Sequence, residues 1–209
     1  YFINSVIVTC SSVFLSCVLA IMGGYALAKL HIPKSNTIIS AFMTFSFIPG
    51  IAIYISLYSM MGKVNLTGNL LTLILPYTAW QIPFSMYIMK QYFETLPVEL
   101  IESGRIDGSN EFQAFFKIML PLVKPAIATI LVFNFVGNWG ELMWANIATA
   151  SSISIKTLPV GLLNFKNEMG VQWGPYCAGI AMVTIPLMLV FGFFQKYFVG
   201  GLTNGAVKG

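Results

Sequence analysis

Residues 1–28 read YFINSVIVTCSSVFLSCVLAIMGGYALA, and this run contains no charged side chain. A helix crosses the hydrocarbon core of a bilayer with about 20 mostly apolar residues, so the run is long enough to span a membrane. The rest of the chain is similar, because 57% of its 209 residues are hydrophobic, 9% are charged and the mean hydropathy is +0.80. Soluble domains carry about 25% charged residues. The sequence therefore predicts an all-α integral membrane protein.

Four further apolar runs are long enough to span the bilayer. They cover residues 35–62, 64–89, 125–140 (with the helix running on past Glu141) and about 175–195. We therefore expect a polytopic helical bundle with five spans, which forms a single transmembrane domain over residues 1–209. Prolines inside three of the runs predict kinked helices around a polar path, because each proline frees a backbone carbonyl that neighbouring groups must satisfy. These prolines are Pro49, Pro76, Pro83 and Pro186.

Lysine and arginine accumulate on the cytoplasmic side of membrane proteins and so predict the orientation. One side of the five-span chain carries eight of them: Lys29, Lys34, Lys90, Arg105, Lys117, Lys124, Lys196 and Lys208. The other side carries three: Lys63, Lys156 and Lys166. We predict that the side with eight is cytoplasmic, which places residues 90–124 and the C-terminus in the cytoplasm and residue 1 outside. Because the chain begins at Tyr1 without the basic region of a signal peptide, we expect one further span upstream, six in all.

Several kinds of activity lack their sequence signals here. No basic patch interleaved with aromatic residues indicates nucleic-acid binding, and the net charge of +4 follows from the membrane orientation. His31 is the only histidine and the three cysteines show no C-x-x-C spacing, so we expect no metal site. The stretch MGKVN at 61–65 lacks the first glycine and the hydroxyl residue of a phosphate-binding loop. We therefore expect no catalytic residue and no ATP site in this chain.

Residues 90–124 hold nine of the eighteen charged residues (11 Lys and Arg, 7 Asp and Glu), which predicts a water-exposed excursion between the third and fourth spans. A first helix is expected to follow Thr95, which would act as its N-cap. Glu102 is expected to pair with Arg105 on the outer face of this helix. An apolar face of low relief comprises Leu100, Ile101 and Gly104.

A turn and a second helix complete the excursion. Asp107-Gly108 predicts the turn, because glycine accepts a positive φ without penalty. One face of the second helix carries Phe112, Phe115, Phe116 and Met119, the opposite face carries Asn110, Gln113, Ala114 and Lys117, and Leu120-Pro121 with Pro125 end it. A helix that floats on lipid headgroups is the alternative, but such helices are rich in basic residues. Acids are as frequent as bases here, which favours a protein partner for this helix-turn-helix.

The spacing of these residues resembles the cytoplasmic signature of ABC-importer permease subunits. That signature is Glu-Ala-Ala, three residues, Gly, nine residues and Ile-x-Leu-Pro. In this chain it reads Glu102-Ser103-Gly104, Gly108, Ile118, Leu120 and Pro121. Ser103 and Gly104 stand where alanines are usual, and all three residue types are small enough for close docking.

Other stretches extend the resemblance over nearly the whole chain. They are NSVIV (4–8), GGYALAKL (23–30), residues 96–127, NWGEL (138–142), TLPVGL (157–162) and GGLTNGAVKG (200–209). Together they resemble the carbohydrate-uptake branch, specifically the second permease of maltose-type and glycerol-phosphate-type systems. Where this branch has Trp-Asn-Glu, the chain has Trp139-Gly140-Glu141.

The resemblance implies a function, a location and a set of partners. The chain would be a multi-pass permease subunit of an ATP-driven importer for sugars or oligosaccharides, in the plasma (inner) membrane of a prokaryote, with a cytoplasmic C-terminus. Its partners would be a second permease subunit in a heterodimer, two cytoplasmic ATPase subunits, an extracytoplasmic solute-binding protein and membrane lipid. ATP and Mg would bind to the partner ATPase, and this chain would bind no cofactor.

The resemblance also implies which residues dock on the ATPase. Residues 90–124 would be the cytoplasmic coupling loop, in which Leu100, Ile101 and Gly104 form the docked face and residues 112–116 anchor the loop to the bundle. The complete docking set is Glu99, Leu100, Ile101, Glu102, Gly104, Arg105, Asp107, Gly108, Phe112, Phe115, Leu120 and Pro121.

Glu141 is the only carboxylate within a predicted span. Counted from Pro125 it lies about 24 Å along the helix, near the outer surface, where Trp139 and Trp144 would flank it as an aromatic belt. Two interpretations stay open: a hydrated glutamate at the interface, or a residue of the substrate path that hydrogen-bonds sugar hydroxyls. The candidate path residues are Asn134, Asn138 and Glu141.

Residues 150–173 are too polar to span and are expected to form an external loop. The resemblance implies that part of this loop reaches the sugar cleft of the binding protein, and a plain surface loop is the alternative. The residues concerned are Asn164, Phe165, Lys166, Asn167 and Glu168.

Two other classes of protein have different signals. A self-contained secondary transporter usually has a deep ionisable residue for ion coupling, and Glu141 is too shallow for that role. An intramembrane enzyme needs a nucleophile with a base, or a metal cluster, inside the spans, and the sequence shows neither. The permease remains the favoured interpretation.

Overall fold

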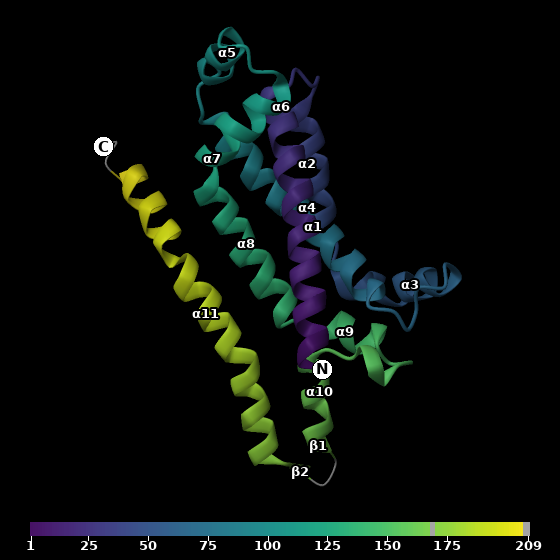
Figure 1. Ribbon diagram of the computed structural model, residues 1–209. Coiled ribbons are helices and arrows are strands. Elements are labelled where there is room, and N and C mark those ends of the chain that lie inside the picture. The colour runs from purple at the N-terminus through teal and green to yellow at the C-terminus, as the bar shows by residue number, and fades with distance from the viewer. Residues whose placement is uncertain (168–169, 207–209) are drawn as a thin grey trace. The chain divides into compact units, whose positions relative to one another are not determined.

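The computed structural model describes residues 1–167 and 170–206 (Figure 1). Two residues named above, Glu168 as a binding-protein contact and Lys208 as a cytoplasmic lysine, lie outside the described residues. Helices make up most of the described chain, which confirms the predicted all-α fold class.

The elements follow one another with short connections. The longer helices are α1 (Phe2–Lys29), α2 (Ser35–Ser46), α3 (Gly50–Lys63), α4 (Leu71–Glu94), α5 (Glu99–Ile106), α8 (Lys124–Trp139) and α11 (Trp173–Ala206). Shorter ones are α6 (Glu111–Gln113), the π-helix η1 (Ala114–Met119), α7 (Leu120–Leu122), α9 (Met143–Ala148), the 3-10 turns η2 (Ile153–Ile155) and η3 (Leu163–Phe165), and α10 (Leu158–Leu162). Strand β1 (Lys166–Asn167) pairs antiparallel with β2 (Gly170–Val171).

Length and composition identify two helices that can cross a membrane unaided, Phe2–Lys29 and Trp173–Tyr197. Two more candidates are bent pairs: α2 with α3, bent by 91°, and Glu111–Leu122 with α8, bent by 74°. The described residues thus offer up to four spans by this measure. Helix α4 is long enough but is not counted, because its polar residues and prolines lower its hydropathy. The count of five spans stays a prediction.

The predicted break at residues 48–50 is confirmed. Pro49 precedes α3 with φ −60° and ψ 120°, an extended conformation, and the 91° bend lies between α2 and α3. Proline has no amide hydrogen and disfavours a helical conformation in the residue before it, so the break follows from the sequence. Pro76 and Pro83, in contrast, lie inside the continuous helix α4.

Two predicted helix boundaries are wrong. The fourth span does not run on past Glu141, because α8 ends at Trp139 and α9 begins at Met143. The poor helix former Gly140 follows Trp139, and the Glu141 carboxylate binds backbone amides of the next helix instead. The third span begins at Leu71 rather than 64, since residues 64–70 form turns.

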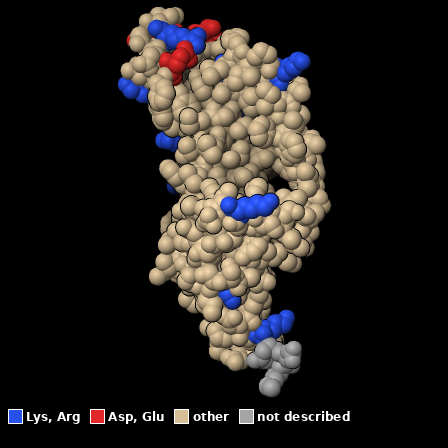
Figure 2. Space-filling view, turned by 90° about the vertical axis from the view of Figure 1, so that its right-hand side faces the viewer, with Lys and Arg blue, Asp and Glu red and all other residues tan. Residues whose placement is uncertain are grey.

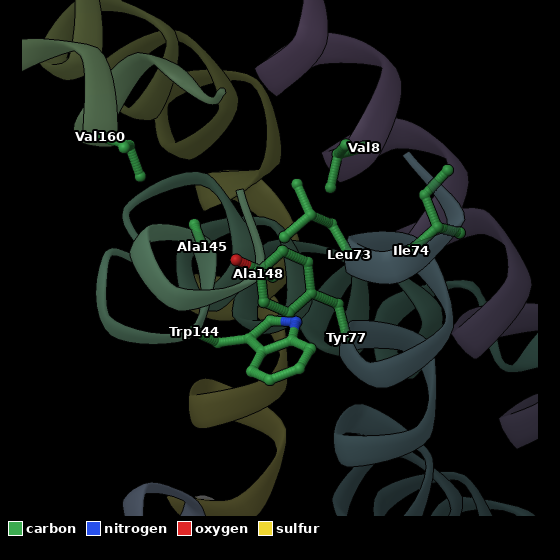
Figure 3. Packing of buried hydrophobic residues seen from close by; sticks show 8 residues of the cluster. All are labelled: Val8, Leu73, Ile74, Tyr77, Trp144, Ala145, Ala148 and Val160. Carbon is green, nitrogen blue, oxygen red and sulfur yellow. The ribbon is translucent and has the colours of Figure 1, made fainter. Parts of the chain in front are cut away.

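The chain forms two compact units. The first comprises Tyr1–Leu15, Phe47–Trp80 and Val132–Phe193, and the second comprises Ser16–Ser46, Gln81–Leu131 and Phe194–Gly209. The core of the first unit is a cluster of Val8, Leu73, Ile74, Tyr77, Trp144, Ala145, Ala148 and Val160 (Figure 3). Trp144 is fully buried in this cluster, and its indole nitrogen donates a hydrogen bond of 3.2 Å to the carbonyl of Thr72. This bond satisfies the polar atom of an otherwise apolar side chain.

In the second unit, α1 packs closely against α4 through small residues. Ser16, Ala20 and Gly24 are buried, and the Ser16 hydroxyl bonds the side-chain oxygen of Gln81 at 3.1 Å. A Cβ atom on Gly24 would lie 2.6 Å from Cβ of Met89, so no larger residue fits without movement. Ser16, Ala20 and Gly24, spaced four residues apart, therefore form a packing surface on α1.

Candidate functional site

Helix α5, the first helix of the predicted coupling loop, begins later than the sequence suggests. Thr95 does not cap it, because its hydroxyl donates a hydrogen bond of 2.8 Å back to the carbonyl of Tyr92. The helix starts at Glu99, and Val98 occupies the cap position without a side-chain bond. Glu99 and Glu102 lie in its first turn, where the positive end of the helix dipole favours carboxylates.

The apolar residues of α5 face their own chain. Ile101 is 3% exposed and Gly104 is buried, and a Cβ on Gly104 would lie 2.5 Å from Cδ1 of Ile118 in the second loop helix. Ile101 and Gly104 therefore pack against their own chain, and the docked face of Leu100, Ile101 and Gly104 stays a prediction. Leu100 is half-buried.

The outward surface of α5 is mainly charged. The exposed residues of α5 and its two cap positions are Val98, Glu99, Glu102, Ser103, Arg105, Ile106 and Asp107. Ile106 leaves 86% of its surface exposed beside these charges. Figure 2 shows acidic and basic side chains gathered over α5 and α6. The surface that a partner could contact thus combines charge with two exposed apolar side chains, Val98 and Ile106.

The predicted turn at Gly108 is confirmed. This glycine has φ +85°, the region that residues with a side chain rarely adopt, and no atom lies within 4 Å of the position of a Cβ. After the turn, Asn110 caps α6: its side chain accepts from the amide of Gln113 at 2.9 Å, and the Gln113 side chain accepts from the amide of Asn110 at 3.2 Å. This reciprocal pair starts the second loop helix.

Arg105 pairs across the turn. Its Nη2 lies 2.7 Å from Oε1 of Glu111, and its Nε donates to the same oxygen at 2.8 Å. The predicted partner Glu102 is therefore wrong, because the turn at Gly108 brings Glu111 back to the end of α5. Both side chains of the pair are more than half exposed, so the bond orients the two helices more than it stabilises them.

The second loop helix contains a π-helical section. Residues 111–122 are continuously helical, but Ala114–Met119 forms i→i+5 bonds, for example from the amide of Leu120 to the carbonyl of Phe115. The assignment of Ala114 to a polar face is consequently wrong, since Ala114 is fully buried. Leu120 is half-buried and Pro121 is exposed.

Phe115 anchors this helix to α1. Its ring lies 4.8 Å from that of Tyr25, which in turn lies 5.4 Å from the ring of Phe93 in α4. Phe112 is 71% exposed and Phe116 is 51% exposed, so the predicted anchor reduces to Phe115. A groove of about 280 Å³ lies between the two helices and is lined by Met22, Tyr25, Ala26, Leu30, Glu111, Phe112, Phe115 and Phe116.

Glu141, in the first unit, caps a helix. Its carboxylate accepts hydrogen bonds from the amide of Trp144 at 2.8 Å, the amide of Ala145 at 3.0 Å and the hydroxyl of Tyr77 at 2.6 Å. It therefore satisfies the free amides at the start of α9, a role that neither sequence interpretation included. The predicted aromatic belt is wrong, because Trp139 and Trp144 are 2% and 0% exposed.

The two asparagines of the candidate path are also buried. Asn138 is 7% exposed and donates a hydrogen bond of 2.6 Å to the hydroxyl of Ser12 in α1. Asn134 is 3% exposed. The structure therefore places Asn134, Asn138 and Glu141 in one unit, with Asn138 and Glu141 engaged in internal hydrogen bonds.

The predicted external segment is folded rather than irregular. It contains η2, α10, η3 and the β1–β2 pair. Asn4 of α1 donates to the carbonyls of Ser154 and Lys156 at 2.7 and 2.9 Å, and the amide of Leu158 donates to the hydroxyl of Ser5 at 2.8 Å. These bonds fix the base of the segment to the start of α1.

Of the candidate binding-protein contacts, Asn164 and Phe165 lie in η3 and Lys166 and Asn167 lie in β1. Asn164 and Lys166 are exposed, and Phe165 is half-buried. The side-chain amide of Asn164 (Nδ2) donates to the hydroxyl of Tyr1 at 3.4 Å. Lys166 and Asn167 form the short strand β1.

The hydrophobic helices and the folded loop between α4 and α8 define a helical membrane protein. Residues 18–204 match the family described as binding-protein-dependent transport system inner membrane component, and the chain belongs to this family. The alternative of a self-contained secondary transporter is therefore set aside. The chain is a multi-pass subunit of a transport system in the inner membrane.

Similar proteins cover the whole chain. The arabinooligosaccharides transport system permease protein AraQ of Halalkalibacterium halodurans is 34% identical over 209 residues, which are 100% of this chain and 74% of that protein. The diacetylchitobiose uptake system permease protein DasC of Streptomyces coelicolor is 32% identical over 100% of this chain and 75% of its own length. The trehalose transport system permease protein SugB of Mycobacterium tuberculosis is 32% identical over 99% and 76%. The resemblance to carbohydrate-uptake permeases is thus confirmed.

Two solved structures share the fold. A bacterial ABC transporter involved in the import of the acidic polysaccharide alginate matches with a TM-score of 0.78 and 25% identity, over 94% of this chain and 74% of that chain. The methionine ABC transporter MetNI in an inward-facing conformation matches with a TM-score of 0.70 over 92% and 90%. At 17% identity, the second match supports the fold alone. The chain is a permease subunit of the ABC-transporter type.

Proposed function

We propose that this chain forms part of the translocation path of an ATP-driven importer of sugars or oligosaccharides. The observation that carries the substrate class is that three relatives matched over essentially the whole chain are named as permeases for arabinooligosaccharides, diacetylchitobiose and trehalose. The ligand that co-purifies with the associated binding protein, identified by mass spectrometry, tests this class. A ligand that is not a carbohydrate would contradict it.

The loop around α5 is the proposed docking element for a cytoplasmic ATPase. The geometry supports this role, because Ile106 is 86% exposed beside the exposed charges Glu102, Arg105 and Asp107. An exposed apolar side chain within a charged rim suits a protein partner better than water or lipid. The internal contact of Gly104 with Ile118 makes the two loop helices one rigid piece for such a partner to push.

The remaining partners complete the assembly. A second permease subunit forms a heterodimer with this chain, two ATPase subunits bind ATP and Mg in the cytoplasm, and an extracytoplasmic binding protein delivers the ligand near residues 164–168. Closure of the ATPases moves α5, and the continuous helical residues 111–122 transmit the motion to the spans. Alternating access occurs between membrane helices, while phosphate chemistry belongs to the ATPase. The C-terminus is cytoplasmic.

Substitution at Gly108 tests the docking role. Val cannot adopt φ +85° without a strain of about 1–2 kcal/mol, so Gly108→Val should redirect α5 and lose the ATPase in co-purification from membranes. Gly108→Asn is the matched control, because Asn tolerates this φ and no atom lies within 4 Å of a Cβ there. Asn should retain binding. If the Val variant binds the ATPase like the wild type, the loop is an ordinary connector.

The energy source has its own test. The permease purified free of ATPase should hydrolyse no ATP, because its sequence lacks a phosphate-binding loop. The measurement is phosphate release with and without added ATPase subunits. Hydrolysis by ATPase-free permease would overturn the division of labour proposed here.

A further inference from the structure

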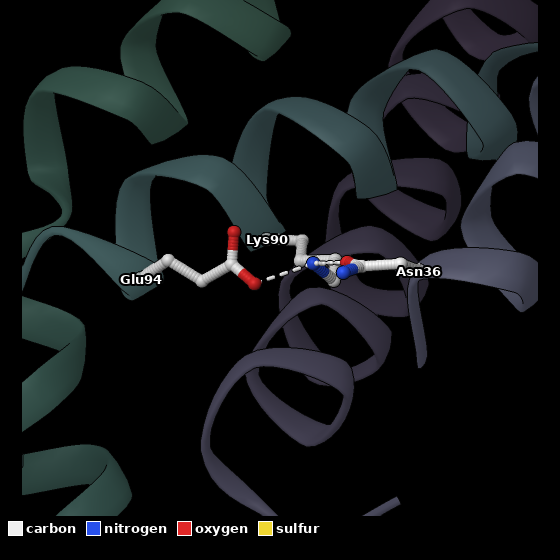
Figure 4. A network of polar contacts seen from close by, with 3 residues as sticks. All are labelled: Asn36, Lys90 and Glu94. Atoms are coloured by element: carbon white, nitrogen blue, oxygen red, sulfur yellow. Dashed lines mark hydrogen bonds and ion pairs between the residues drawn. The ribbon is translucent and has the colours of Figure 1, made fainter. Parts of the chain in front are cut away.

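Lys90 of α4 is a fully buried cation with two partners (Figure 4). Its Nζ lies 2.7 Å from Oδ1 of Asn36 in the first turn of α2 and 2.5 Å from Oε1 of Glu94, the last residue of α4. Desolvation of an ammonium costs several kcal/mol, which such bonds must offset. The side chain therefore joins the start of α2 to the last turn of α4.

A second lysine, Lys29, bonds the connection that follows α4. Lys29, the last residue of α1, donates through Nζ to the carbonyl of Leu96 at 2.5 Å. Leu96 lies in the connection between α4 and α5. The chain that enters the docking helix is thus tied to α1 immediately before α5 begins.

The backbones of α1 and α4 also meet at this level. A Cβ on Gly24 would lie 2.9 Å from the amide nitrogen of Lys90, so the two helices are as close as their backbones allow. Two cationic contacts and one close backbone contact therefore act on the end of α4 and on the connection that follows it. All of these residues belong to the second compact unit.

We infer that Lys90 is a positioning residue which, together with Lys29, locks α1, α2 and the end of α4 into one body with the α5 loop. A displacement of α5 then moves these helices without slippage. This inference rests on the proposed docking of α5 on the ATPase, and it adds the connection through which the displacement reaches the spans.

Stability alone does not account for a lysine at this position. Glu94 keeps 40% of its side chain exposed and Asn36 is exposed, so both could bond water if the ammonium were absent. Methionine has a similar length and volume and needs no partner, and because Glu94 can bond water the substitution leaves no buried charge unpaired. Lys90→Met should therefore remain folded while the link between α2 and α4 is lost.

Spin-label distances test this inference. Labels are attached to cysteines at Ser40 in α2 and Lys117 in η1, both exposed, after the native Cys10, Cys17 and Cys177 are changed to Ala. In nanodiscs the otherwise wild-type permease should give one narrow distance, unchanged when ATPase subunits and Mg-ATP are added. Lys90→Met and Asn36→Leu should each broaden it, the double variant should broaden it no further, and Lys90→Arg should restore it.

Two controls accompany the distance measurements. Lys34→Met, which removes an exposed lysine near Asn36, should leave the distance narrow. Thermal unfolding of Lys90→Met should match wild type, whereas a merely structural lysine would lower the midpoint. A narrow distance in both Lys90→Met and Asn36→Leu, or a wild-type distance that shifts with Mg-ATP, would overturn the inference. Failure of the ATPase to co-purify with wild-type permease would instead reject the docking proposal and leave the nucleotide-free distances interpretable.

Discussion

The hydroxyl of Tyr77 donates a hydrogen bond of 2.6 Å to the carboxylate of Glu141, which joins residues 64 positions apart. Tyr77 is 2% exposed, so the bond lies at the edge of the core of the first unit. The same carboxylate accepts two amides at the start of α9, where the helix dipole favours a negative charge. Glu141, a candidate residue of the substrate path, thus accepts three hydrogen bonds from groups of its own chain.

Substitutions at Glu141 should reduce stability before they reduce transport. Glu141→Ala leaves the two amides and the Tyr77 hydroxyl without their acceptor, so the free energy of unfolding should fall by about 1–3 kcal/mol. Glu141→Gln keeps an acceptor oxygen and should lose less. Thermal unfolding in detergent measures both. An Ala variant with wild-type stability but no transport would restore Glu141 to the substrate path.

Gly24 and Gly23 should respond differently to alanine. A Cβ on Gly24 would meet the backbone of Met89 and Lys90, which cannot move alone, so Gly24→Ala should cost about 1–3 kcal/mol of unfolding free energy. A Cβ on Gly23 would meet only the flexible end of Met86, at 2.5 Å from Cε. Gly23→Ala should be nearly neutral. Equal unfolding midpoints for the two variants would contradict the close packing of α1 on α4.

Alanine should be tolerated at Gly104. The obstacle to its Cβ is the terminal carbon of Ile118, which can rotate away, and alanine favours a helix over glycine by about 1 kcal/mol. Gly104→Ala should therefore keep ATPase association, whereas Gly104→Leu should force the loop helices apart and weaken it. Co-purification of the ATPase measures both. Retention by the Leu variant would show that the contact with Ile118 does not position α5.

Deletion of residues 164–168 should impair the response to the binding protein without affecting assembly. The base of this segment is fixed by Asn4 and Ser5, so the deletion removes the exposed Asn164 and Lys166 and leaves those bonds in place. The readout is ATP hydrolysis of the assembled transporter when binding protein, purified with its own ligand, is added. A Gly/Ser replacement of equal length is the control for loop length. Undiminished stimulation by both variants would favour a plain surface loop.

Local patterns in the sequence predicted the features that depend on a few neighbouring residues. Apolar run length gave the all-α class, Pro49 gave the break before α3, and Asp107-Gly108 gave a turn with a positive φ. The family signature is equally local, because it depends only on spacing. These features need no knowledge of distant contacts.

Pairs of side chains that meet across a turn or between helices could not be predicted from local patterns in the sequence. Arg105 had carboxylates at Glu102 and Glu111 within reach, and only the geometry of the turn selects Glu111. From the sequence, Lys90 served only to predict the membrane orientation, because no neighbouring residue indicates that its partner is Asn36 in α2. Ala114 was misplaced because a regular period of 3.6 residues does not hold through a π-helix.

The π-helix Ala114–Met119 also bears on the rotational orientation of the span that follows the docking loop. In an ordinary helix each added or removed residue turns everything beyond it by about 100°. A π-helix contains one residue more than the α-helix that would bridge the same ends, so deletion of Lys117 could let the segment relax into regular α-helix. The helical turns on either side would then keep their relative orientation, which the same deletion in a regular α-helix would change. In this loop the π-helix therefore takes up one residue without rotating the helix beyond it, so the length of the loop helix is decoupled from the orientation of the span that follows.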